Sequence, residues 1–142
     1  MTLSLQEISD RLEIHDLIVE YADIIDRCDI DALDHIFTED AFIDYTAMGG
    51  EKGGREPIKT FLKSVLPIFN NTQHLISNFQ IKVEGDSATG RIMCFNPMEM
   101  KNKDGDNPVM LLGLWYVDEY VRTEFGWRIS RRVEEKSYQV NL

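Results

Sequence analysis

The spacing of apolar residues changes midway along this chain, and the change limits the folds open to it. Over residues 5–25 apolar side chains recur at helical intervals, as on one side of an amphipathic helix. Ser4 and Glu7 form a capping-box pattern at its start. A second, shorter helix is expected at 31–37, and a third at 57–69, where a proline suits the first helical turn.

From residue 73 onward the pattern becomes that of strands. Runs rich in apolar residues, separated by polar turns, predict four strands, at 73–84, 88–100, 109–122 and 127–138. A short alternating segment predicts another strand at 41–46. Strands joined by short turns favour an antiparallel sheet. Helices followed by strands, without βαβ alternation, predict a single α+β domain over residues 1–142.

One predicted strand has an irregular alternation. Phe79 and Val83 fall on one face, whereas His74 and Ile76 fall on the other. A single β-bulge near residues 77–78 would turn both sets toward the core. Because bulges often re-aim side chains near sites, His74 becomes a candidate functional residue.

Charge and composition narrow the possible partners. The chain of 142 residues has a formal net charge of −10, which argues against nucleic acid and anionic membrane surfaces. The N-terminus lacks the features of a signal peptide, and no stretch approaches the ~20 apolar residues of a membrane span. We therefore expect a cytoplasmic protein in which Cys28 and Cys94 remain free thiols.

Few side chains in the sequence indicate chemistry. No spacing typical of a metal site, a phosphate-binding loop or a nucleophile motif occurs, so neither a metal nor a cofactor is expected. Asp26 ends the first helix, where it either faces water or holds a partner such as His74. Tyr21 and Tyr45 lie on apolar faces and are either core aromatics or hydroxyl groups in a pocket.

Several segments together resemble a known family. They are Tyr-Ala-Asp-Ile-Ile-Asp at 21–26, Asp29, Phe-Ile-Asp-Tyr at 42–45, Thr-Gln-His at 72–74 and Gly-Trp-Arg-Ile at 126–129. The chain resembles the SnoaL-like, scytalone-dehydratase-like branch of the nuclear-transport-factor-like superfamily. This resemblance implies a cystatin-like cone, in which a curved antiparallel sheet is wrapped by three N-terminal helices around a deep pocket.

The resemblance also implies a catalytic pair. Scytalone dehydratase, bile acid dehydratase and hexachlorocyclohexane dehydrochlorinase place an Asp–His pair in the pocket, and Asp26 and His74 match its positions. Tyr21 falls where the bile acid enzyme has a tyrosine. Tyr45 resembles a tyrosine that helps scytalone dehydratase to hold a water on the substrate carbonyl.

The departures from scytalone dehydratase imply a more apolar pocket. Met98 stands where that enzyme has a second pocket histidine, and Met110 and Leu112 stand near its serine and asparagine. Scytalone itself is therefore not the expected substrate. Asn96 and Arg131 are expected to supply polar contacts from the strands.

The resulting prediction is a lyase that removes water or another small group from a hydrophobic cyclic compound. His74 acts as base, Asp26 orients it, and Tyr45 or Tyr21 donates to an oxygen. Two alternatives stay open: a SnoaL-type cyclase or isomerase, and a non-catalytic binding or oxygenase-small-subunit-like module. An open pocket lined by the Asp–His pair favours an enzyme, whereas a pocket filled by methionine side chains favours a module.

Two further expectations concern the whole molecule. Five large apolar residues of one predicted strand exceed what one face holds, which predicts a homodimer or homotrimer; they are Met110, Leu112, Leu114, Trp115 and Tyr116. The glycine-rich segment 48–55 is expected to be more mobile than the helices and to gate the pocket mouth.

Overall fold

A computed structural model describes residues 2–102 and 104–142 of the chain. The three predicted helices are present: α1 is Leu5–Arg27, the 3₁₀ helix η1 is Ile30–His35, and α2 is Arg55–Val65. The last of them follows two strands along the chain and ends before residue 69, to which the sequence pattern extends it. Two single 3₁₀ turns, η2 at Thr46–Met48 and η3 at Leu66–Ile68, flank α2 along the chain. Among the described residues, no helix is both long enough and apolar enough to cross a membrane.

One half of the capping box predicted for the first helix is confirmed. The Ser4 hydroxyl accepts a hydrogen bond from the backbone N–H of Glu7 at 3.1 Å. The helix is capped by Cys28, which adopts the left-handed conformation with φ 57° and whose N–H donates to the carbonyls of Ile24 and Ile25. This termination leaves Asp26 in the last helical turn.

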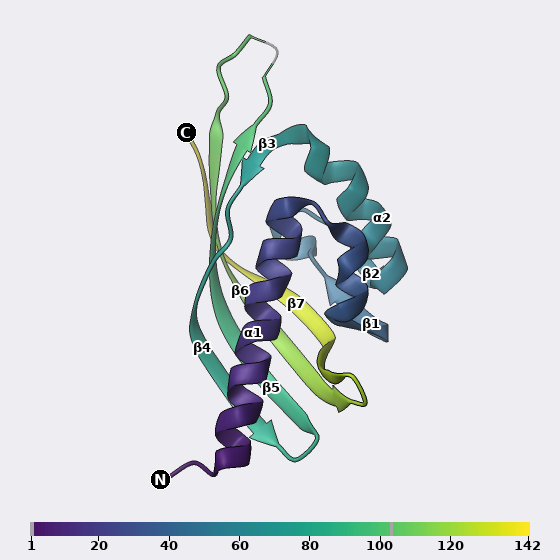
Figure 1. Cartoon of the computed structure of the whole chain (residues 1–142). Coiled ribbons are helices and arrows are strands. Elements are labelled where there is room, and N and C mark those ends of the chain that lie inside the picture. Colours follow the sequence, from purple (N-terminus) through teal and green to yellow (C-terminus); the bar gives the residue numbers. More distant parts are fainter. Residues whose placement is uncertain (1, 103) are drawn as a thin grey trace.

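Seven strands form one curved sheet that wraps around α1 (Figure 1). The strands are β1 (Phe37–Asp44), β2 (Lys52–Gly54), β3 (Phe69–Thr72), β4 (Leu75–Glu84), β5 (Ser87–Met100), β6 (Val109–Thr123) and β7 (Gly126–Asn141). Their order is β2-β1-β7-β6-β5-β3, with β4 also paired to β5. The α+β cone is confirmed.

The sheet is mixed rather than wholly antiparallel. Strand β1 pairs with β7 in parallel, with Phe42 opposite Arg131 and Asp44 opposite Val133. The chain enters β1 from a helix and not from a neighbouring strand, so the hairpin argument for antiparallel pairing does not apply to it. The remaining pairs are antiparallel.

The predicted bulge in β4 is confirmed. The pairing of β4 with β5 shifts between Ser77 and Gln80, and Asn78 adopts a left-handed φ of 51°. Ile76 before the shift and Ile81 after it both pack on the core. The extra residue therefore lets both halves of the strand present apolar groups inward.

A second β-bulge, in β7, determines which of two neighbouring arginines faces the interior. Ile129 is opposite Tyr120 and Arg131 is opposite Glu119, so Ser130 has no partner in the ladder. Ile129 and Arg132 are consequently both fully buried, although three positions separate them. Without this bulge, simple alternation would place Arg131 inside.

The buried carboxylate of Asp10 fixes the N-terminal half of α1 to the end of β6 and the start of β7. Asp10 accepts hydrogen bonds from Arg122 Nη1 at 2.8 Å, Arg122 Nη2 at 2.9 Å and Trp127 Nε1 at 3.1 Å. These bonds, led by that of Arg122 and opposed by burial, lower the pKa of Asp10 to about 2. The apolar stripe of α1 then lies against the concave face, as predicted.

The large apolar residues of β6 do not crowd the outer face of the sheet, contrary to the reason given for an oligomer. Met110, Leu112, Leu114 and Tyr116 share the inner face of β6 and line a cavity, whereas Trp115 alternates with them. They therefore do not overfill the outer face. Apolar side chains are exposed elsewhere, at Leu75, Val117, Tyr138 and Val140, and the homo-oligomer stays a prediction.

Candidate active site

A cavity of about 170 Å³ lies between the helices and the concave face of the sheet. Side chains from α1, α2 and strands β5 to β7 form its wall, together with the turn at Met48–Gly50. Met98, Met110 and Leu112 all line it, so the positions that depart from scytalone dehydratase are apolar parts of this wall. The cavity therefore favours an apolar ligand with few polar groups.

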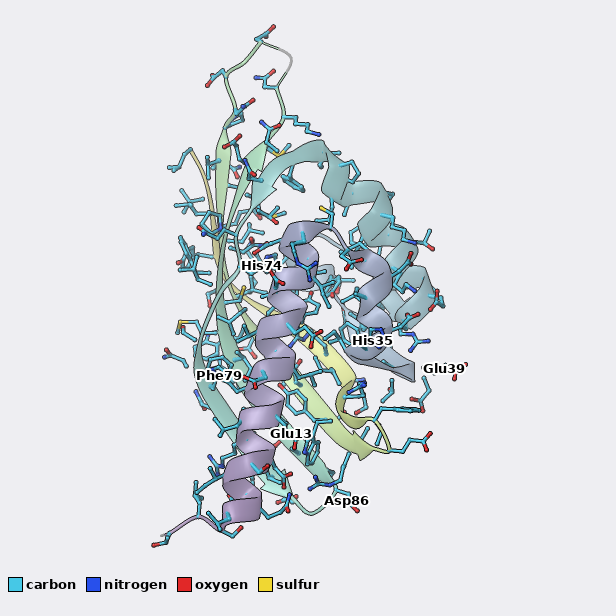
Figure 2. The ribbon with its side chains drawn as sticks, in the orientation of Figure 1. Glu13, His35, Glu39, His74, Phe79 and Asp86 are labelled. Carbon is cyan, nitrogen blue, oxygen red and sulfur yellow. The ribbon has the colours of Figure 1, made fainter. Side chains whose placement is uncertain are left out.

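The structure brings Asp26 and His74 together at this cavity. The Nδ1 of His74 lies 2.6 Å from Oδ1 of Asp26, and the histidine side chain is 6% exposed and lines the cavity. Figure 2 shows His74 beside the C-terminal end of α1, where Asp26 is located. Since the carboxylate accepts from Nδ1–H, Nε2 is the ring nitrogen left for a ligand.

Local backbone structure fixes the pair. Residues 73–74 lie between β3 and β4, so the N–H of His74 leaves the ladder and donates to Asp26 Oδ2 at 2.9 Å. The Thr72 hydroxyl donates to Asp26 Oδ1 at 2.8 Å. Burial raises the pKa of Asp26, but the hydrogen bonds from His74 and Thr72 outweigh burial and bring the pKa below its usual value. Asp26 is therefore ionised at neutral pH.

Two tyrosines meet inside the cavity. The hydroxyls of Tyr21 on α1 and Tyr45 after β1 lie 2.7 Å apart, and both side chains are buried. Burial raises the pKa of Tyr21 to about 12 and that of Tyr45 well above its usual value. Both phenols keep their protons at neutral pH, so this pair has a proton to donate to an oxygen of a ligand.

Asn96 is placed beside the histidine. Thr72 is paired with Met98 and Leu75 with Phe95, so Asn96 lies opposite His74 on β5. The Asn96 side chain lines the cavity, and its buried Oδ1 has no hydrogen-bond partner among the described residues. A buried acceptor of this kind is costly unless a ligand supplies a donor.

The prediction that Arg131 contributes to the pocket is wrong. Arg131 is about half exposed, lies 3.7 Å from Glu119 and covers the ring of Phe42. The bulge at Ser130 turns Arg132 inward in its place. Arg132 does not reach a ligand freely, because its Nε and Nη2 are bound to Asp118 at 2.8 and 2.7 Å.

Sequence reasoning missed Glu134. This residue lines the cavity, and its buried Oε2 has no hydrogen-bond partner among residues 2–102 and 104–142. Burial, opposed by Arg132 and aided by Asp44, raises the pKa of Glu134 to about 8. The signal lay in parity: once β7 is shifted at Ser130, Glu134 shares the inner face with Arg132.

The other histidines lie apart from this site. His15 packs its ring 4.3 Å from that of Phe79, and His35 is exposed on η1. Within the described part of the chain, no three His, Cys, Asp or Glu side chains gather as a metal site would require. Both described cysteines, Cys28 and Cys94, are free thiols.

The fold and cavity define a nuclear-transport-factor-like protein with an interior cavity. The sequence profile of the SnoaL-like domain matches residues 6–133, and the chain belongs to that family. It is 50% identical over 138 residues to the uncharacterized protein Rv2910c of Mycobacterium tuberculosis, covering 96% of this chain and 92% of that protein.

Solved structures share the architecture. A candidate aromatic ring hydroxylase from Novosphingobium aromaticivorans has a TM-score of 0.85 and 31% identity, over 95% of this chain and 94% of that one. A candidate scytalone dehydratase from the same species has a TM-score of 0.85 and 22% identity, over 95% and 89%. The hexachlorocyclohexane dehydrochlorinase LinA-type3 from Novosphingobium barchaimii has a TM-score of 0.82 and 23% identity, over 97% and 93%. The last two are similar in fold alone.

Proposed function

We propose that this protein is a lyase that removes a small leaving group from a hydrophobic cyclic compound by acid–base chemistry, without a cofactor. The observation that carries the proposal is the Asp26–His74 pair at the cavity wall. An imidazole whose Nδ1–H donates to a carboxylate presents Nε2 to the cavity, where this nitrogen can take a proton from a ligand.

The chemistry begins at a carbon next to a carbonyl group of the ligand. His74 takes a proton from this carbon, and the ionised Asp26 stabilises the imidazolium that forms. Tyr45 or Tyr21 donates to the carbonyl oxygen, where negative charge collects. Acid–base help of this kind is worth ~100- to 10,000-fold in rate, and positioning in the cavity supplies more.

The cavity limits the size of the substrate. Its volume of about 170 Å³ is close to that of an engineered apolar cavity of ~150 Å³ that takes up benzene. A compound with one six-membered ring fits this space. The dehydratase and dehydrochlorinase names of the two relatives in fold agree with an elimination, while the residues above carry the argument.

A pair of test compounds probes the elimination directly. One is cyclohexanone with a hydroxyl on the carbon β to the carbonyl, and the other is the matching β-chloro ketone. Both yield the same cyclohexenone, whose conjugated double bond is followed by absorbance. Asp26→Asn and His74→Ala should each lower the rate above background ~100- to 10,000-fold on any ketone that the wild type turns over.

His35→Ala is the matched control, because His35 is exposed on η1 and remote from the cavity. It should leave the rate unchanged. Wild-type turnover that survives His74→Ala would contradict the proposal. The absence of turnover of both ketones by the wild-type protein would contradict it as well.

One observation favours a second candidate, a binding or oxygenase-associated module. The relative with 31% identity bears the name of an aromatic ring hydroxylase. A binding module is disfavoured because the side chains of β5 do not fill the cavity: Met93, Phe95 and Met100 are absent from its wall. Calorimetry with cyclohexenone separates the two candidates, because a module binds the ring without turning over either ketone.

A further inference from the structure

Two groups of polar side chains face the cavity from opposite parts of the sheet. His74 and Asn96 lie on the side of β3 to β5, whereas Glu134 lies on β7 and Tyr45 follows β1. Strand β6 separates β7 from β5 in the order of the sheet. His74 and Glu134 would therefore approach a bound ring from different sides of the cavity.

Glu134 and Tyr45 are neighbours within their group. Asp44 is opposite Val133 in the parallel pair of β1 and β7, and Tyr45 and Glu134 follow these two residues. In a β-hydroxy ketone the carbonyl and the hydroxyl are attached to two ring carbons that flank the carbon losing its proton. Two adjacent donors on one wall and a base on another match this arrangement of oxygen, carbon and oxygen.

Among the described residues, no hydrogen bond joins Glu134 to the buried Arg132 beside it. Asp118 supplies the counter-charge of Arg132 through both carboxylate oxygens, which accept from Nε and Nη2, while the buried Nη1 has no hydrogen-bond partner in the described part of the chain. The Oε2 of Glu134 instead has no hydrogen-bond partner among the described residues, although it is buried at a cavity wall. An unsatisfied buried oxygen is expensive, and a ligand oxygen at this place would satisfy its proton.

We infer that Glu134 is the acid of the elimination, a catalytic residue that gives its proton to a departing hydroxyl, and that the substrates are therefore monocyclic β-hydroxy carbonyl compounds. The inference rests on the proposed function. An acid at this position favours a hydroxyl as the leaving group, because hydroxide departs poorly unless it receives a proton, whereas chloride departs without one.

The elimination moves one proton from carbon to His74 and another from Glu134 to the leaving oxygen. The C–H proton moves to Nε2 of His74, and the C–H electron pair becomes the new C=C bond. The C–O bond breaks with its electron pair on oxygen, and that oxygen takes the carboxyl proton of Glu134 and leaves as water. Solvent then carries the proton from the imidazolium back to the Glu134 carboxylate.

The protonation state required of Glu134 follows from its surroundings. Burial raises its pKa to about 8, against the opposing charge of Arg132 and with the help of Asp44. The other titratable groups around it are neutral phenols and a thiol whose pKa values are all raised, those of Tyr21, Tyr45, Tyr116 and Cys94. At neutral pH the carboxyl group therefore holds its proton.

The test compares Glu134→Gln with the wild type on the β-hydroxy and β-chloro cyclohexanones. The variant keeps the shape of the side chain but has no acidic proton. We expect its turnover of the hydroxy ketone to fall ~100-fold or more and its turnover of the chloro ketone to stay within about threefold. The wild-type rate on the hydroxy ketone alone should fall as the pH rises through about 8.

Equal losses on both ketones would overturn the inference, because they would mean a structural role for Glu134. No loss on either would overturn it too, since the leaving hydroxyl would then be protonated by another group. A wild-type protein inactive on both ketones would refute the proposed function and its substrate class together, which distinguishes that failure from the other two.

A measurement without substrate gives a further check. A carboxyl with a raised pKa binds its proton more tightly in the folded state than in the unfolded state. The free energy of unfolding should therefore fall as the pH rises from 4.5, the ordinary pKa of a glutamate, to about 8, the pKa of Glu134. The melting temperature of the wild type should fall relative to that of Glu134→Gln across this interval. Parallel curves for the two proteins would overturn the inference, because Glu134 would then have no proton to give at neutral pH.

Discussion

Replacing Asp118 by asparagine should severely destabilise the protein, because it leaves a buried guanidinium without a counter-charge. The side chains of Asp118 and Arg132 are both fully buried, and they form two hydrogen bonds of 2.8 and 2.7 Å. Tyr120 donates a third hydrogen bond to Asp118 at 2.6 Å. Arginine stays charged in proteins, so the variant cannot escape by losing a proton.

The magnitude follows from this geometry. Breaking a buried pair by removing one partner costs about 3–5 kcal/mol. With a urea dependence of about 2 kcal/mol per molar, the unfolding midpoint of Asp118→Asn should fall by about 2 M. Circular dichroism at increasing urea concentration measures this shift.

The control is Glu135→Gln, which removes a surface ion pair with Arg91 of nearly the same length, 2.8 Å. Exposed pairs contribute at most about 1 kcal/mol, so its midpoint should move little. Combining Asp118→Asn with Arg132→Met removes the unpaired charge and should recover much of the loss. A midpoint for Asp118→Asn within the range of the control would refute the reasoning.

Three other outcomes are expected. Asp10 has a pKa near 2, below its ordinary value of 3.8, so its ionised form stabilises the fold at neutral pH and this contribution is lost as the pH falls from 3.8 toward 2. Over that interval the melting temperature of the wild type should fall more steeply than that of Asp10→Asn. Hydrogen exchange should be faster in residues 48–55 than in α1, and equally slow exchange would argue against a gate. Light scattering at micromolar concentration should show a particle larger than the 16.5 kDa monomer, and a monomer alone would exclude the predicted homo-oligomer.

The two bulges show why one part of the site was predictable and another was not. The bulge at 77–78 lies between apolar residues, so its absence would leave hydrophobic side chains outside, and the sequence pattern reveals it. Ser130 is followed by two arginines, whose polarity does not tell which of them faces inward. The pattern therefore could not distinguish Arg131 from Arg132, and the inward position of Glu134 was missed with it.

Long-range contacts set the other limit. Apolar spacing predicted α1 and the C-terminal strands within a few residues, because these depend on local pattern. Nothing local indicates that β1 runs parallel to β7. Likewise, the residues alone left Asp26 either solvated or paired with a partner such as His74, and the resemblance favoured the pair, whose members lie 48 positions apart.

The pairing of β1 with β7 has a consequence for the way the chain is made. Strand β1 is complete at Asp44, but its partner begins at Gly126, close to the C-terminus. At a synthesis rate of about 5–20 residues per second, the interval lasts roughly 4–16 seconds. During this time α1 lacks the part of its cover that β7 supplies, so apolar surface of the helix stays exposed on the nascent chain, which is the condition under which chaperones bind.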